Sequence, residues 1–472
     1  MNSAETAYLF RHALLRDAAY HLHLPSSRAR LHALALAVLE DAFGGRPEEM
    51  PPLEVSPDEA SRPLPCDAVA AELAGHARLA LAAPGEDAAR LVAAQKLYLR
   101  RGAAWADRNF RGETAGRLWE ELAGLLEGDS RGAALCRAAN AAQHIGRLGA
   151  AALLYERAVA LHRAGGNAAL EAVALGNLAG MHQRSGRAAE AERDYDRTLA
   201  LLRAKGDRRG EGKILGNVAM LWQESGDAAR AAALFDEALA IHRECGNRSS
   251  ESTVLGNRAS FHKRIGRAED AERGFAEALA LARELKDRRH EGSLLSNLAN
   301  LFQETGRTEL AQRTREQAIA LIRETGQRRT EGMALLSQAN LHREAGQLEP
   351  AFRLARQALG ISRELGDRRT EGVALGNLAG LHEESGRLAE AMSGYEVAIA
   401  IHREFGNKRF EGNHLCSSAL TLLALGRADE ARARWNEGAE ILRAAGELRD
   451  LESALDYMQV ACRAAGVAPF RD

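Results

Sequence analysis

The sequence is poor in proline, aromatic residues and cysteine, and each shortage limits the folds that it can adopt. Of its 472 residues only ten are proline, and none of these lies between residues 85 and 349. Because a proline inside a helix costs about 3 kcal/mol, this stretch permits uninterrupted helices. Aromatic residues make up 5% of the chain, so the apolar content of 46% depends on alanine and leucine, which favour helices.

The chain also lacks the signatures of several protein classes. Its five cysteines are scattered without a CxxC pair or a close histidine, so neither a disulfide framework nor a zinc site is expected. There is no run of 18 apolar residues and no secretory signal pattern at the start. With 63 basic and 65 acidic residues the net charge is −2, which argues against nucleic-acid or membrane binding. We therefore expect a cytoplasmic protein.

Glycine divides most of the chain at regular intervals. One series recurs every 40 residues at Gly146, Gly186, Gly226, Gly266, Gly306, Gly346, Gly386, Gly426 and Gly466. A second series, offset by 20 residues, runs from Gly166 to Gly446 and is interrupted only at Lys286. Two glycines in each period separate two segments that are long enough for helices, so each unit is predicted to be a helical hairpin.

Apolar residues recur with the same period. A leucine series begins at Leu135 and Leu175, and an alanine follows each leucine four residues later. In the second helix of each unit another alanine precedes a large residue by four positions, at Tyr155, Tyr195, Phe235, Phe275, Tyr395 and Trp435. These spacings place the residues on one helical face. The prediction is an all-α fold, a right-handed α-solenoid or superhelix of antiparallel helix pairs.

The chain divides into six predicted regions. Residues 1–43 are expected to form two helices, over 4–24 and 26–43, and residues 44–67 form an exposed proline-rich linker. Residues 68–130 are expected to be helical and to contain one or more diverged repeats. The array covers 131–447 with eight units, seven of them of 40 residues, and it is followed by a capping helix over 448–466 and a tail over 467–472.

The pattern of small and aromatic residues resembles the tetratricopeptide repeat, here in a 40-residue form. The string ELGDRRTEGVALGNLAGLHEESGRLAEAMSGYEVAIAIHREFGN, residues 364–407, is similar to repeats of the Leu-Gly-Asn spindle-orientation scaffolds and of kinesin light chains. The resemblance implies a non-enzymatic scaffold that binds a protein or peptide partner in its concave groove.

The first 43 residues resemble a different family. The string YLFRHALLRDAAYHLHLPSSRARLHALALAVLE, residues 8–40, looks like the segment that follows the ATPase core of large bacterial signalling ATPases and cyclase-linked regulators. The chain contains no GxxxxGK[ST] loop for nucleotide phosphates. The resemblance implies an alternative function, as the sensing or regulatory arm of an ATPase or transcription regulator in the same pathway, without the nucleotide-binding core.

Asparagine recurs two residues after the leucine series, and we call this set the asparagine column: Asn177, Asn217, Asn257, Asn297 and Asn377. An amide offers both a donor and an acceptor, which suits the main chain of an extended peptide. The alternative is that each amide bonds a neighbouring helix. Nearby positions that vary between units are expected to add specificity, among them Asn300, Asn340, Lys213, Lys263 and Arg343.

Other recurring polar residues have structural explanations. Arginine ends each second helix from Arg163 to Arg443, where a cation favours the helix dipole. Arg208 and Glu211 typify pairs three residues apart, which are expected to form solvated ion pairs between repeats. The histidine position shared by His182 and His262 holds Trp222 in another unit, so it is expected to pack rather than to bind metal. No catalytic motif stands out, and we expect no enzyme activity, metal or cofactor.

Overall fold

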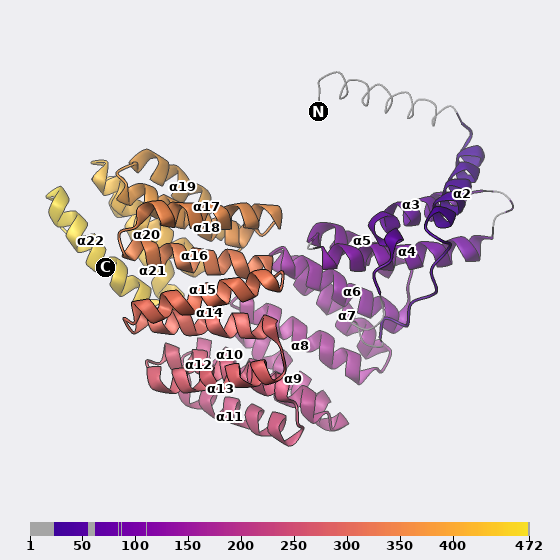
Figure 1. Ribbon diagram of the computed structural model, residues 1–472, viewed down its shortest axis with the longest axis horizontal. Coiled ribbons are helices and arrows are strands. Elements are labelled where there is room, and N and C mark those ends of the chain that lie inside the picture. The colour runs from indigo at the N-terminus through magenta and orange to yellow at the C-terminus, as the bar shows by residue number, and fades with distance from the viewer. Residues whose placement is uncertain (1–22, 55–61, 84, 86, 110, 471–472) are drawn as a thin grey trace. The chain divides into compact units, whose positions relative to one another are not determined.

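The computed structural model describes residues 23–54, 62–83, 85, 87–109 and 111–470 (Figure 1). These residues contain 21 α-helices and no strand, which confirms the all-α prediction. Within the described residues no helix is both long and apolar enough to span a membrane. The helix predicted over 4–24 lies almost wholly outside the described residues. The chain forms two compact units, the first comprising residues 1–143 and 149–174 and the second 144–148 and 175–472.

The first unit contains the helices that precede the array and the first helices of the array. Their bounds are α2 (Pro25–Ala42), the 3-10 helix η1 (Pro65–Val69), α3 (Ala70–Ala80), α4 (Ala88–Arg108), α5 (Gly112–Gly124), α6 (Gly128–His144), α7 (Leu148–Ala164) and the start of α8 (Ala168–Arg184). Helix α2 begins at Pro25, since the fixed backbone angle of proline suits the first position of a helix.

Within the segment between α2 and α3, three of the described residues are buried. Leu53, Cys66 and Asp67 are buried. The Asp67 carboxylate accepts hydrogen bonds from Arg101 at 2.6 Å and from Arg108 at 2.8 Å. Prolines prevent this segment from forming a long helix, but its apolar residues and the arginines of α4 hold it against the neighbouring helices.

The second unit consists of paired helices of nearly constant length. Their bounds are α9 (Ala188–Lys205), α10 (Arg208–Glu224), α11 (Ala228–Glu244), α12 (Arg248–Arg264), α13 (Ala268–Glu284), α14 (Arg288–Glu304), α15 (Thr308–Glu324), α16 (Arg328–Glu344), α17 (Leu348–Glu364), α18 (Arg368–Glu384), α19 (Leu388–Glu404), α20 (Lys408–Ala424), α21 (Ala428–Ala444) and α22 (Leu448–Ala465). Figure 1 shows the two helices of each pair lying side by side.

Residues with a positive backbone angle φ separate consecutive helices. The glycines of both series adopt this left-handed conformation, which costs glycine little because it has no side chain. Lys286 occupies the gap in the second series and has a φ of 57°, the only positive value among the described non-glycine residues. The lysine therefore follows the period of the array at a cost in backbone strain.

The small residues predicted at the helix crossings are fully buried. Ala219, Ala231 and their counterparts in the other units are at most 1% exposed, and the large residue above them, such as Phe235, is also buried. The small side chains let paired helices approach closely, and the large ones fill the remaining space. Two units differ at the large position, where Arg315 and Ala355 stand, and both side chains are 0% exposed.

Candidate functional site: two polar columns of the repeat array

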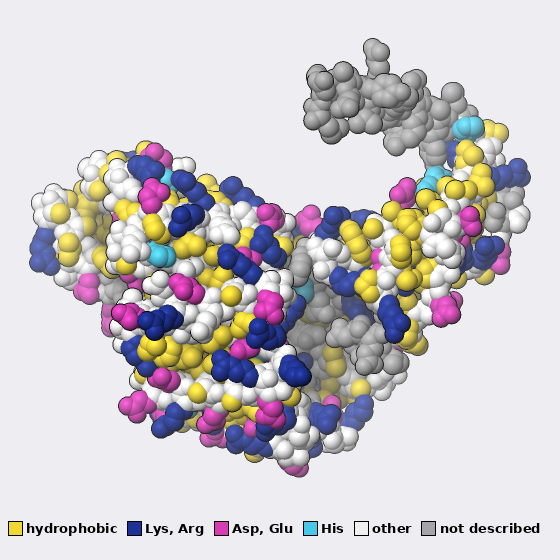
Figure 2. All heavy atoms as spheres, in the orientation of Figure 1, with side chains coloured by type: hydrophobic (Ala, Val, Ile, Leu, Met, Phe, Trp, Pro, Cys, Tyr) yellow, Lys and Arg dark blue, Asp and Glu magenta, His cyan; other side chains and the backbone are white. Residues whose placement is uncertain are grey.

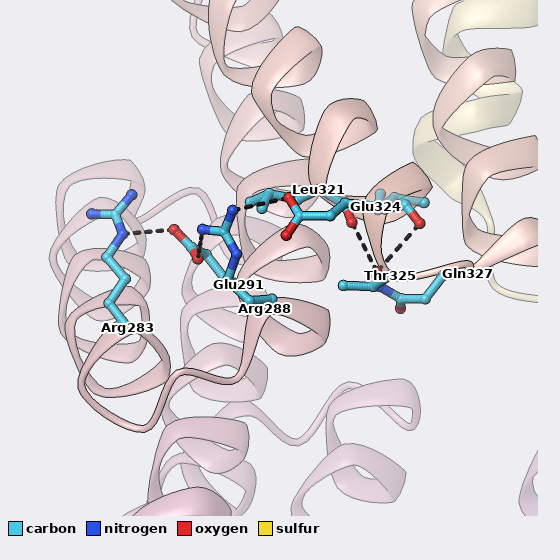
Figure 3. A network of polar contacts seen from close by, with 8 residues as sticks. Arg283, Arg288, Glu291, Leu321, Glu324, Thr325 and Gln327 are labelled. Carbon is cyan, nitrogen blue, oxygen red and sulfur yellow. Dashed lines mark hydrogen bonds and ion pairs between the residues drawn. The ribbon is translucent and has the colours of Figure 1, made fainter.

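The first polar column joins each helix pair to the next. In Figure 3, Glu291 at the start of α14 lies between two guanidinium groups. Nε of Arg283, in the last turn of α13, donates to it at 2.8 Å, and Arg288 donates at 3.3 Å. Arg288 also donates to Glu324 of α15 at 3.0 Å. The Glu291 carboxylate and the Arg288 guanidinium together thus connect three consecutive helices.

The same contacts recur along the array, and we call them the joint network. The central glutamates are only 2% to 6% exposed: Glu211, Glu251, Glu291, Glu331, Glu371 and Glu411. Each is paired with the arginine that ends the preceding helix, at 2.6 to 2.9 Å: Arg203, Arg243, Arg283, Arg323, Arg363 and Arg403. The expectation that the helix dipole explains these arginines is therefore incomplete, because they also form ion pairs with the next unit. The network does link repeats as expected, but its carboxylates are buried rather than solvated.

Two carboxylates of the joint network have a pKa below the ordinary value although they are buried. Burial alone would raise the pKa of Glu211, but hydrogen bonds from Arg203 and Arg208 outweigh that effect and place the pKa below its ordinary value. The pKa of Glu371 is lowered against burial in the same way by Arg363 and Arg368. These glutamates have all the partners that their position requires, so the joint network serves to hold the repeats together.

The second polar column is the asparagine column on the first helices of the pairs. Successive first helices contact each other, as α10 does with α12 and α16 with α18. Asn177, Asn217, Asn257 and Asn377 are half-buried, and Asn297 is exposed. Among the described residues, no protein group hydrogen-bonds any of these five side-chain amides. The alternative in which each amide bonds a neighbouring helix is therefore not observed.

Polar side chains farther along the first helices do bond one another. Lys263 pairs with Glu304 at 2.7 Å, and Arg343 pairs with Glu384 at 2.6 Å. Among the positions expected to confer specificity, Lys263 and Arg343 are thus already engaged. Lys213 is exposed, and neither it nor Asn340 has a polar partner in the described part of the chain.

Arg315 of α15 lies buried beneath these polar side chains and bonds two of them, although its place in the sequence does not show it. Its guanidinium donates to the side-chain oxygen of Asn300 at 3.0 Å and to that of Gln303 at 2.8 Å. Burial lowers the pKa of Arg315, while nearby Glu344 acts in the opposite direction. Because both amide oxygens accept from Arg315, the amide of Asn300 presents its NH₂ group away from the guanidinium.

In other units a tyrosine stands at the position of Arg315, and its hydroxyl makes a similar polar contact. The Tyr195 hydroxyl donates to Gln183 at 3.1 Å, and the Tyr395 hydroxyl donates to Glu383 at 2.9 Å. The large residue of the second helix therefore brings a polar group up to the first helix in several units. The tyrosines in the sequence could have indicated that this position has polar neighbours, and hence that Arg315 would find hydrogen-bond acceptors there.

Two histidines near the end of the array, His402 and His414, are buried and form no ion pair with any described residue. Burial, with a smaller effect from Arg369, lowers the pKa of His402 to about 4. Burial and the neighbouring His402 lower the pKa of His414 to about 3. A Cβ at Gly376 would lie 2.1 Å from the His414 ring, so only glycine fits beneath it. Both imidazoles are neutral at pH 7 and act as packing groups.

Charge is distributed evenly on the face of the array drawn in Figure 2. Basic and acidic side chains are interspersed there, without a large patch of one sign. Among the described residues there is also no group of three or more side chains that could hold a metal ion.

The fold and the two columns define a solenoid of helical hairpins. The tetratricopeptide repeat family model matches residues 170–244, 250–324 and 291–364. Over these residues the chain carries tetratricopeptide repeats, as the sequence pattern predicts. The resemblance of residues 8–40 to signalling ATPases is not confirmed by these matches, and residues 8–22 lie outside the described part.

Solved structures provide a further comparison. A Rap protein complexed with Competence and Sporulation Factor is similar with a TM-score of 0.52 and 14% identity, over 75% of this chain and 99% of that one. A signal transduction ATPase with a tetratricopeptide repeat sensor, from Pyrococcus horikoshii, has a TM-score of 0.47 and 15% identity, over 71% of this chain and half of that one. A putative kinesin light chain repeat protein of Podosopora anserina has a TM-score of 0.34 and 18% identity, over 40% of this chain and 94% of that one. A comparison with curated proteins found no match.

Proposed function

We propose that the array is a protein-interaction scaffold whose asparagine column binds the main chain of an extended peptide segment from a partner protein. Tetratricopeptide repeats generally bind protein partners, and the similar Rap protein is one in complex with a peptide factor. The observation that carries the proposal is the set of five amides, on the first helices α8, α10, α12, α14 and α18, that no described protein group bonds. The proposed role involves no catalysis.

The chemistry of the amide supports main-chain rather than side-chain recognition. Each amide can donate to a peptide carbonyl and accept from a peptide N–H at once. An extended peptide offers these two groups at every residue whatever its side chains, so a recurring amide matches a recurring backbone. Lys213, Asn300 and Asn340 then lie on the same set of helices as contacts for side chains of the peptide.

The experiment begins with peptides selected from a random 15-residue display library on the full chain. A selected peptide is then synthesised with N-methyl groups at alternate residues, which removes N–H donors and leaves the side chains in place. We expect N-methylation to weaken binding by about tenfold or more, because each lost hydrogen bond contributes about 0.5–1.5 kcal/mol. Methylation in the other register, on residues whose N–H groups face away, serves as the control. Equal tolerance of both registers would contradict main-chain recognition.

The alternative function, as the sensing arm of a signalling ATPase, depends on residues 8–40. Their structure is described only from residue 23 onward. Of residues 8–40, the described residues 23–40 lie mainly in α2, and none of their contacts favours that function over peptide binding.

A further inference from the structure

A cavity of about 820 Å³ lies within the first unit. Helix α4 forms one wall, the end of α5 and the start of α6 form another, and the segment that follows α2 forms the third. Cavities of roughly 300–1,000 Å³ are the usual size for small-molecule sites. The cavity is therefore large enough for a ligand.

The third wall is held in place by specific contacts. The Arg100 guanidinium of α4 donates to the carbonyl oxygen of Met50 at 3.5 Å and also to that of Pro51. Leu53 is buried, and the Ser130 hydroxyl of α6 donates to Glu54. The segment is thus attached to two different helices, so the cavity has a defined boundary on this side.

Most of the lining is apolar. The aliphatic side chains that face the cavity are Leu53, Val92, Leu97, Leu122 and Leu126. Aliphatic walls favour a hydrocarbon body, since removing apolar surface from water stabilises a complex.

The charged lining has an excess of positive charge. Lys96 and Arg100, one helical turn apart on α4, both line the cavity, against Glu49 as the carboxylate in the lining. Burial, and secondly the nearby Arg137, lower the pKa of Arg100 to about 10, although Glu54 acts in the opposite direction. Lys96 is half-buried and has no ion-pair partner among the described residues. A bound anion would therefore give both cations an ion-pair partner, which the described protein does not supply.

We propose that this cavity binds a small amphipathic anion, an aliphatic carboxylate whose chain lies against the leucines and Val92 and whose carboxylate pairs with Lys96 and Arg100. The guanidinium uses one nitrogen for the carbonyls of residues 50 and 51, so its remaining N–H groups can donate to the ligand. This site is separate from the asparagine column and does not depend on the peptide proposal.

The test is calorimetric titration of the full chain with decanoate, below its micelle concentration. Decanol and decyltrimethylammonium, which have the same chain with a neutral or a positive head, are the matched ligands. We expect one decanoate to bind per chain, with decanol about tenfold weaker or more because it lacks the charge. Absence of decanoate binding, or equal affinity for the acid and the alcohol, would overturn the proposal.

Two variants locate the site. Lys96→Gln should weaken decanoate about fivefold to tenfold and leave decanol unchanged, since it removes one charge. Ala93→Phe places a ring in the cavity from an exposed position of the lining, and should weaken both ligands about tenfold or more by filling the space. Lys205→Gln, the same change at an exposed position of α9, is the control. Melting curves verify that each variant is folded, and unchanged decanoate binding in a folded Ala93→Phe chain would place the ligand elsewhere.

Discussion

The joint network and the asparagine column have the same period, but they differ in how their polar groups are satisfied. Glu291 and its counterparts are buried, and each is bonded by two cations. The amides of Asn217, Asn257 and Asn297 reach the surface, and no described protein group bonds them. Recurrence along an array thus has two physical meanings. A column whose groups bond each other maintains the stacking of the repeats, and a column whose groups have no protein partner is available to a ligand.

The largest effect should come from leaving a joint carboxylate unpaired. Replacing both Arg283 and Arg288 by alanine leaves Glu291 buried without a cation, and should lower the free energy of unfolding by about 3 kcal/mol. Replacing Glu291 by alanine should cost less, about 1 kcal/mol, because the two arginines are half-exposed and water can solvate them. Urea unfolding measures both variants. Equal losses, or a larger loss for the glutamate variant, would contradict the claim that the buried carboxylate depends more on its partners than the half-exposed arginines do.

The buried histidines should make stability depend on pH. Their folded-state pKa values, about 4 for His402 and about 3 for His414, lie below the ordinary value of 6.5. The unfolded chain therefore takes up protons first, and stability that is complete above pH 6.5 is lost as the pH falls toward 4. By pH 4.5 the free energy of unfolding of the C-terminal helices should fall by at least about 2 kcal/mol, and His414→Leu should reduce this fall. Melting temperatures between pH 7.5 and 4.5 measure the effect, and an identical pH profile in the leucine variant would refute this cause.

Arg315 is buried like the glutamates of the joint network. Like the amides of the asparagine column, it forms no ion pair with any described residue. Its Nε has no hydrogen-bond partner among the described residues. Arg315→Tyr restores the residue of other repeats and should stabilise helices α14 and α15 by about 1 kcal/mol. Hydrogen exchange in the parent chain should be fastest, among internal repeats, over residues 288–367, and the variant should slow it. Uniform protection from 168 to 447 in the parent chain would contradict this.

A backbone change tests the array without altering either column. Lys286 has a left-handed φ of 57°, where the equivalent residues are glycine. Lys286→Gly should raise the free energy of unfolding by about 1 kcal/mol because it relieves that strain. Lys205→Gly, which places glycine in the last turn of α9 instead, is the control and should destabilise. A lower melting temperature in Lys286→Gly would show that the lysine side chain makes a compensating contact.

The period of the sequence was sufficient to predict the helix pairs, because glycine and alanine report local backbone and packing requirements. It also identified the pairing of Arg208 with Glu211, which lie three residues apart on one helix. The bond between Arg288 and Glu324 was beyond it, since these residues lie at opposite ends of one helix pair and meet only once α14 and α15 have packed together. The buried contacts of Arg315 were missed for the same reason, and so was the cavity, which requires residues 49–54 to fold back on α4.

The most direct test of the central claim compares two properties of one variant, the chain in which Asn217, Asn257 and Asn297 are all replaced by alanine. Its affinity for a peptide selected on the parent chain should fall at least about tenfold, because three main-chain contacts of about 0.5–1.5 kcal/mol each are lost. Its melting temperature should remain close to that of the parent chain, since alanine is a good helix former and no described protein group loses a partner. Gln317→Ala combined with Asn436→Ala removes exposed amides from second helices and should change neither property. A triple variant that melts earlier but binds the peptide as tightly as the parent chain would show that the asparagine column is structural and would contradict this account.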